Sequence, residues 1–255
     1  MVAHLREALR RNLCTAGLSL SEAFSAQRYN SDPLCTRFSP LPTFPNRKST
    51  AAFIIFSTKA MWEPFKNYLA EDPVNRLEGT ANPIDDYART KIADALREAL
   101  PADVAYEIRY PYEEGERFVY FQRMAHLAGL AYFDPNWQFL CVHPVHGPWL
   151  AFRAVVLVDL DGPDPTVSVE EVKNPCGGVV DHARALYEQL QEEAASDPHD
   201  LATAYHKRWR MLVQIRDELA SFLGERAVRE RYSDTQVTYH YLKDRQILRD
   251  ALNRR

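Results

Sequence analysis

The residue in this sequence with the clearest need for a partner is Arg153, which lies within the otherwise apolar run WLAFRAVVLV. An unpaired cation buried in a sheet costs several kilocalories per mole, so the guanidinium must meet a protein carboxylate or the anion of a ligand. The two-residue period of a strand places four apolar residues on the same face as Arg153. They are Trp149, Ala151, Val155 and Leu157. The pattern leaves open whether the partner of Arg153 is internal or a ligand.

A second cluster of reactive residue types is CVHPVHGPW, which places Cys141, His143 and His146 close together. One thiolate and two imidazoles form a ligand set that suits a transition metal. Pro144 interrupts the strand alternation, and no fourth ligand follows in the sequence. We therefore expect the histidines to edge a turn, and the sequence predicts no metal site.

Two further places offer polar groups beside small or apolar residues. His126 lies in the predicted helix MAHLAGLAY, where small residues leave room for a ligand or for a tightly crossing helix. On spacing alone, a hydrogen-bonded core histidine is the favoured interpretation. Ser57 and Thr58 end an apolar strand, either at the mouth of an open sheet or as a helix cap.

The familiar signatures of nucleotide binding and hydrolysis are missing from the sequence. It contains only nine glycines and no GxGxxG or GxxxxGK[ST] motif, so a flavin would be held by polar side chains and backbone amides. No Ser-His-Asp, paired-carboxylate or HExxH pattern occurs, so in an enzyme we expect a cofactor to carry the chemistry. The four scattered cysteines predict reduced thiols rather than disulfides.

The elements that would position these residues are strands interspersed with helices, followed by a helical region. In order, hydrophobic periodicity predicts a helix over 3–16, a strand over 51–58, helices over 61–70 and 82–101, a strand over 104–110, a helix over 117–131, and strands over 137–143 and 149–158. The short connection between the last two strands predicts a hairpin. The fold class is α+β, an α/β sandwich with a mixed or antiparallel central sheet and flanking helices. Residues 1–180 form the predicted core, and residues 181–255 form a helical region packed on it within a single domain.

Composition and charge exclude several classes of protein. The chain has 255 residues, of which 46% are hydrophobic, and its net charge is −4. That balance offers no basic field for nucleic acid, and the apolar runs are too short to cross a membrane. We expect a cytoplasmic protein with a small-molecule ligand, and a homodimer stays open.

Five segments occur in the order AAFIIFSTKAMWEPFKNYL, NPIDDYARTKIADALREALP, MAHLAGLAYF, CVHPVHGPWLAFRAVVLV and ERYSDTQ. Their succession resembles the cobalamin-processing CblC family, the methylmalonic aciduria and homocystinuria type C proteins. The resemblance covers most of residues 51–158 and about 225–250, whereas residues 181–222 show none.

The resemblance implies a flavin nitroreductase-like fold that holds cobalamin with its lower nucleotide tail detached. It also implies two reactions. Cyanide is removed reductively with electrons from reduced FMN or FAD, and alkyl groups are transferred to the thiolate of glutathione. Such chemistry suits a chain without a protein nucleophile, because the cofactor and the thiol are the reactive species.

Residue by residue, the resemblance implies several contacts. His126 and Gly129 match an HxxG segment that approaches the corrinoid, Arg153 matches an arginine that meets a glutathione carboxylate, and Arg245 matches a second such arginine. The other candidate cofactor contacts are Ser57, Thr58, Ala128, Tyr132, Trp149 and Tyr232.

Three departures keep alternatives open. The connection after Phe133 is shorter than the family's Tyr- and Gln-rich loop, residues 200–223 look inserted, and Arg226 is only a loose counterpart of the remaining glutathione arginine. The alternatives are a flavin-dependent oxidoreductase that acts on a non-corrinoid molecule, and a non-catalytic corrinoid carrier.

Overall fold

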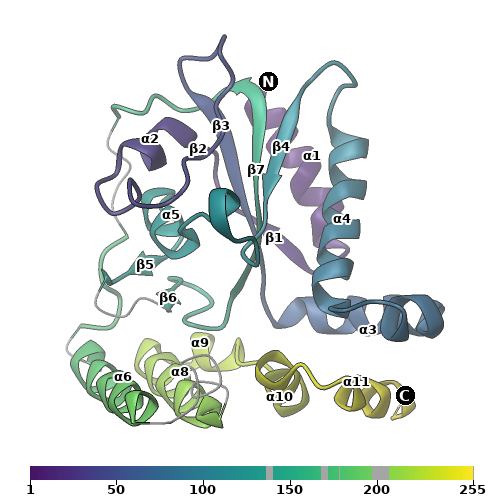
Figure 1. Cartoon of the computed structure of the whole chain (residues 1–255), viewed down its shortest axis with the longest axis vertical. Helices are drawn as coiled ribbons and strands as arrows, with labels where there is room; N and C mark the ends of the chain where they lie inside the picture. The colour runs from purple at the N-terminus through teal and green to yellow at the C-terminus, as the bar shows by residue number, and fades with distance from the viewer. Residues whose placement is uncertain (136–139, 168–171, 178, 197–206, 255) are drawn as a thin grey trace.

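The computed structural model describes residues 1–135, 140–167, 172–177, 179–196 and 207–254. Figure 1 shows an upper part, in which helices cover both faces of a central sheet, and a lower layer of helices from the C-terminal third.

The central sheet is built around two long buried strands, β3 (Thr50–Ser57) and β7 (Ala151–Asp161). The strand order is β1-β3-β7-β4, with β1 at Leu18–Leu20, β4 at Tyr106–Arg109, and β2 (Phe24–Ser25) also pairing with β3. Every ladder between these strands is antiparallel. All eight residues of β3 are buried, as a continuous apolar run with both faces covered requires. The predicted α+β class is confirmed.

One face of the sheet is covered by α1 (Val2–Cys14), α3 (Trp62–Glu71) and α4 (Pro83–Ala99). Helix α1 buries three leucines at helical spacing, Leu5, Leu9 and Leu13. Helix α4 begins where the sequence predicts, because proline fits the first helical position, where its missing N–H is no loss.

The opposite face carries α2 (Ala26–Ser31), α5 (Phe121–Leu127) and a small sheet of β5 (Tyr132–Phe133) and β6 (Cys141–Val142). Helix α5 is shorter than the predicted helix over 117–131. A 3-10 turn over Gly115–Arg117 precedes it, and Gly129 at φ +69° follows it. A residue in this left-handed region ends an α-helix, which is why the small-residue segment does not continue it.

The predicted hairpin between strands 137–143 and 149–158 is wrong. Strand β6 pairs with β5 through Tyr132↔Val142, whereas β7 pairs with β3 and β4. Strand β3 pairs along most of one edge of β7, and β4 pairs with Val155–Val158 on the other edge, so the buried backbone groups of β7 find their partners without the two-residue β6. Residues 137–139 lie outside the described residues.

The C-terminal third is helical, as predicted. It contains α6 (Val179–Ala195), α8 (Trp209–Leu223), α9 (Glu225–Arg229), α10 (Asp234–Leu242) and α11 (Arg245–Asn253). Helices α6 and α8 pack together, and α11 contacts α3. No helix in the described part of the chain is long and apolar enough to cross a membrane. The boundary at residue 180 stays a prediction.

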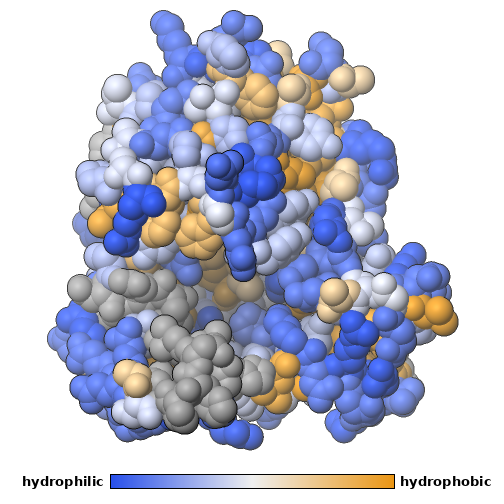
Figure 2. All heavy atoms as spheres, viewed as in Figure 1, coloured by the Kyte–Doolittle hydropathy of each residue, from blue (hydrophilic) through white to orange (hydrophobic). Residues whose placement is uncertain are grey.

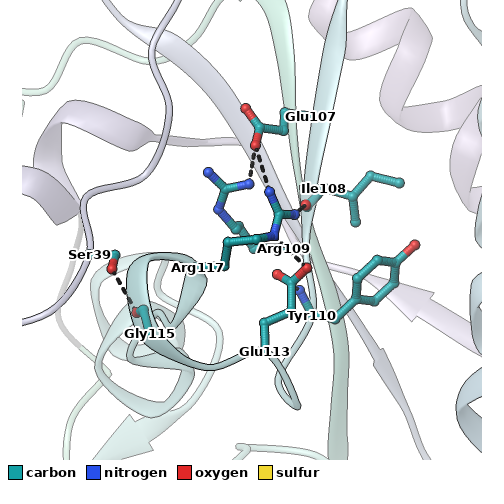
Figure 3. A network of polar contacts seen from close by, with 8 residues as sticks. All are labelled: Ser39, Glu107, Ile108, Arg109, Tyr110, Glu113, Gly115 and Arg117. Atoms are coloured by element: carbon teal, nitrogen blue, oxygen red, sulfur yellow. Dashed lines mark hydrogen bonds and ion pairs between the residues drawn. The ribbon is translucent and has the colours of Figure 1, made fainter.

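Side chains, rather than another strand, occupy the outer edge of β4 (Figure 3). Arg117 Nη2 donates to the carbonyl of Ile108 at 2.8 Å, and the N–H of Tyr110 donates to Glu113 at 2.9 Å. Arg117 and Glu113 also form an ion pair at 2.8 Å. Charged side chains at a sheet edge discourage pairing with another chain, so this network protects the fold.

Candidate functional site

Arg153 lies at a β-bulge in the middle of the sheet. The ladder pairs Ile55 with Ala154 and Phe56 with Phe152, so Arg153 is an extra residue without a partner in β3. An extra residue shifts the alternation of side chains and re-aims the one at the bulge. The prediction that Arg153 shares a face with Val155 and Leu157 is therefore wrong. Those two residues pack on the α5 side, whereas Arg153 meets α4.

The guanidinium of Arg153 has an internal acid partner. Its Nε donates to Ser57 Oγ at 2.9 Å, and its Nη1 lies 3.4 Å from Asp85 Oδ1. Arg153 is only 7% exposed, and Asp85 belongs to the first turn of α4. The internal ion pair, one of the two alternatives left by the sequence, is present. It uses only two of the five guanidinium N–H groups, and Nη2 makes no hydrogen bond to a described residue.

Positive charge exceeds negative charge around Arg153. Desolvation and the charge of Arg153 lower the pKa of Lys243 to about 8, although the residue is exposed and Asp85 opposes the shift. Burial, together with the charges of Lys243, Arg216 and Arg153, holds the pKa of His240 well below its usual range. Positive charge in this region thus comes from Arg153, Arg216 and Lys243, and Asp85 is the acid that opposes it. Such a region favours the binding of an anion.

Trp149 and Tyr232 form the apolar side of this region. Their rings lie 5.4 Å apart, and the two side chains are only 1% and 4% exposed. Neither Trp149 Nε1 nor the Tyr232 hydroxyl has a hydrogen-bond partner among the described residues, although Ser57 is near enough to lower the pKa of Tyr232. Burial outweighs that effect and raises the pKa of Tyr232. Two buried donors without acceptors suit a ligand or water molecules.

The structure therefore brings together four of the predicted site residues: Ser57, Trp149, Arg153 and Tyr232. The sequence missed Asp85, His240 and Lys243. Asp85 is 68 positions from Arg153 in the chain, and His240 and Lys243 lie on or beside a polar helix whose spacing carries no signal of the shared site.

Arg245 does not lie beside Arg153. It contacts the segment that precedes α4. Its guanidinium donates to the carbonyls of Glu78, Thr80 and Ala81, the first at 3.2 Å. A pocket of about 700 Å³ opens here, lined by Thr80, Ala81 and Asp85 among others. Both predicted glutathione arginines thus contact residues that line one pocket.

Thr58 caps the 3-10 helix over Lys59–Met61, because its Oγ1 accepts a hydrogen bond from the N–H of Ala60 at 3.3 Å. Of the two interpretations left by the sequence, the structure shows the helix cap.

The remaining predicted cofactor contacts, His126, Ala128, Gly129 and Tyr132, lie apart from Arg153, on the side of the sheet that α5 covers. His126 is 8% exposed, and its Nδ1 accepts a hydrogen bond from the N–H of Phe133 at 3.3 Å. Its ring lies 6.1 Å from that of Tyr132, and Ala128 is buried at the end of α5. Figure 2, in the view of Figure 1, shows the molecule hollowed between its upper part and the C-terminal helices.

Cys141, His143 and His146 do not converge on a common centre. The Cys141 thiol lies 3.6 Å from the carbonyl of Gln122, and His146 Nδ1 lies 2.8 Å from Glu230 Oε2. His143 and Gly147 close a turn, as the sequence predicts. Within the described ranges, no three His, Cys, Asp or Glu side chains are arranged to hold a metal ion.

His143 is expected to make the stability of the protein fall in mild acid. Burial, together with the charges of His146 and Arg226, lowers its pKa to about 4, and its Nδ1 accepts hydrogen bonds from the N–H groups of Val145 and His146. Below about pH 6.5 the imidazole of His143 is protonated in the unfolded chain but stays neutral in the folded chain. Between pH 7 and pH 5 this difference should therefore lower the free energy of unfolding by about 2 kcal/mol.

Denaturant unfolding of His143→Asn measures this loss. The asparagine oxygen can accept the same backbone hydrogen bonds but does not titrate, so the variant should lose less stability than the parent between the two pH values. Equal losses would show that His143 is not the group responsible.

Comparison with known proteins gives the family. A family model described as the methylmalonic aciduria and homocystinuria type C family matches residues 21–249. This chain belongs to that family. The resemblance inferred from the order of the five segments is thereby confirmed.

Two curated members of the family are similar to this chain, and both are named cyanocobalamin reductase / alkylcobalamin dealkylase. The protein from Bos taurus is 29% identical over 174 residues, which cover 62% of this chain and 58% of the relative. The protein from Homo sapiens is 30% identical over 173 residues, which cover 62% of this chain and 57% of the relative. The chain therefore matches less than three fifths of either relative's length.

A solved structure of the family shows the same fold. It is a B12-trafficking protein CblC from C. elegans, described as a human MMACHC homologue, and it matches with a TM-score of 0.65 at 19% identity. The match covers 98% of this chain and 97% of that one. The matched family span also includes residues 181–222, so the expectation that this segment lies outside the resemblance is wrong, and α6 and α8 lie within the part of the chain that the family covers.

Proposed function

We propose that this chain is an enzyme that processes cobalamin. It removes the cyanide ligand with electrons from a reduced flavin, transfers an alkyl ligand to the thiolate of glutathione, or does both. Membership of the family and the names of the bovine and human relatives support the substrate class. The single structural observation that carries the proposal is the buried, bulge-positioned Arg153 in a region of excess positive charge.

Arg153 is suited to receive a carboxylate of glutathione. Its Nη2 is not hydrogen-bonded to any described residue, and a guanidinium fork binds a carboxylate through two parallel hydrogen bonds. Asp85 competes for the same guanidinium, and the pocket of about 700 Å³ beside Asp85 offers room for a peptide. Arg245, which contacts Thr80 and Ala81 in the wall of that pocket, is the proposed partner for a second carboxylate.

The proposed flavin, FMN or FAD, supplies electrons when it is bound. Trp149 Nε1 and the Tyr232 hydroxyl are buried donors without partners in the described part of the chain, so they fit the polar groups of such a ligand. The proposed corrinoid contacts are His126, Ala128, Gly129 and Tyr132, and Ser57 and Thr58 complete the proposed set. A nitroreductase-like sheet, a cytoplasmic location and a homodimer belong to the same proposal.

Mixing the purified protein with cyanocobalamin or methylcobalamin tests the proposal. We expect the corrin absorption to shift toward the form in which the lower base has left the cobalt. Adding reduced flavin under anaerobic conditions should then change the cyanocobalamin spectrum, and adding glutathione should change the methylcobalamin spectrum.

The other outcomes separate the alternatives. A spectral shift without turnover would show a corrinoid carrier. Flavin oxidation by other acceptors, with no corrin shift at excess protein, would show an oxidoreductase for a different substrate and would overturn the proposal.

A further inference from the structure

A pocket of about 620 Å³ lies outside the site described above, between α3 and the start of α10. Eleven residues line it, and four of them are cationic whereas one is acidic. The cations are Lys59, Lys66, Arg231 and Arg254, and the acid is Glu63. In a chain whose net charge is −4, this is a local reversal of sign.

Helix α10, which has nine residues, begins at this pocket. Ser233 caps the helix, because its Oγ accepts a hydrogen bond from the N–H of Gln236 at 3.3 Å. The N–H groups of Asp234 and Thr235 have no acceptor among the described residues. Free N–H groups and the positive end of the helix dipole favour an anion.

Gln236 supplies an independent indication of a ligand. It is only 5% exposed and lines the pocket, yet its carboxamide forms no hydrogen bond with any described residue. Its amide atoms are not sealed off from the pocket, so a ligand there can accept hydrogen bonds from its N–H groups in place of water.

The cations around the pocket differ in how firmly they are held. Arg231 is fixed between Asp217 and Asp234, each at 2.8 Å, and Lys59 donates to the carbonyl of Arg229. Lys66 pairs with Glu63 at 2.8 Å; the Lys66 side chain is 14% exposed, but that of Glu63 is 69% exposed, so water can solvate the carboxylate when the pair separates. No ion pair of Arg254 is formed within the part of the chain that the structure describes. Lys66 and Arg254 can therefore turn toward a ligand.

We propose that this pocket binds the phosphate group of a small phosphorylated molecule. The helix N-terminus and the carboxamide of Gln236 would hold the phosphate oxygens, and Lys66 and Arg254 would neutralise its charge. A dianion makes fuller use of several cations and a helix end than a single carboxylate does. The volume leaves room for an organic group beyond the phosphate.

Calorimetric titration at constant ionic strength, with ribose 5-phosphate, ribose and inorganic phosphate, tests the proposal. We expect saturable binding of ribose 5-phosphate, weaker binding of inorganic phosphate, and none of ribose. Lys66→Met should weaken the binding of ribose 5-phosphate about tenfold, whereas Lys48→Met, the same change at an exposed lysine just before β3, should leave it unaltered.

Gln236→Glu is a second test variant, chosen because this substitution should not disturb the fold. Glutamate at this position completes an S-x-x-E capping box with Ser233 and suits the first turn of a helix, so the fold should be kept while the added charge abolishes binding. The proposal is overturned if ribose 5-phosphate does not saturate, or if Lys66→Met and Lys48→Met have equal effects. It is also overturned if Gln236→Glu binds as the parent does.

Discussion

Replacing Arg153 by alanine should lower kcat/KM for glutathione in methylcobalamin dealkylation about a hundredfold, because two charge-assisted hydrogen bonds to a carboxylate are lost. The corrin absorption shift should remain, since the proposed corrinoid contacts lie on α5 and β5, on the other side of the sheet. Initial rates at varied glutathione, together with corrin titrations, measure the two effects separately.

Asp85→Asn is the matched variant that separates a ligand site from a structural ion pair. Asparagine removes the acid that competes for Arg153 but keeps the size of the side chain. If Arg153 receives glutathione, KM for glutathione should fall several-fold in this variant. The reason is that glutathione no longer has to displace the Asp85 carboxylate from the guanidinium.

If Arg153 serves only the fold, both variants should lower Tm and neither should change the use of glutathione selectively. Equal losses of corrinoid binding and glutathione use in Arg153→Ala would likewise contradict the assignment.

The bulge at Arg153 shows where prediction from the sequence stops. The apolar run around Arg153 correctly predicts a buried strand and a cation that needs a partner. Alternation places the residue on the wrong face, because one extra residue in the ladder changes the side to which a side chain points. Nothing in the local sequence marks the bulge, since it depends on the register that β3 and β7 adopt against each other.

Local patterns predict local structure well and long-range pairing poorly. The buried run of β3 and the proline that opens α4 are both decided by neighbours in sequence, and both are found as predicted. The partners of β6 and the acid beside Arg153 come from distant segments. The order of the five family segments succeeded because it combines stretches that lie far apart in the chain instead of depending on one local pattern.

Gly17→Ala should destabilise the protein by about 3–5 kcal/mol, the second large effect that we expect. Gly17 follows α1 with φ +67°, and a Cβ built on it would lie 2.5 Å from both the carbonyl oxygen of Ala60 and the Cα of Met61. Both are backbone atoms, which cannot turn aside as a side chain does. Denaturant unfolding of the variant and the parent measures the loss.

Gly115→Ala is the control, because Gly115 has φ +58° but no heavy atom within 4 Å of an added Cβ. Gly115→Ala should lower the free energy of unfolding by only about 1–2 kcal/mol, because alanine is less stable than glycine in a left-handed conformation. A similar loss in both variants would mean that strain, and not contact with Ala60 and Met61, makes Gly17 necessary. A much larger loss at Gly17 would show that the end of α1 fixes the turn directly after Ser57 and Thr58. In that case the position of Ser57 beside Arg153 depends on a helix that never touches the proposed ligand.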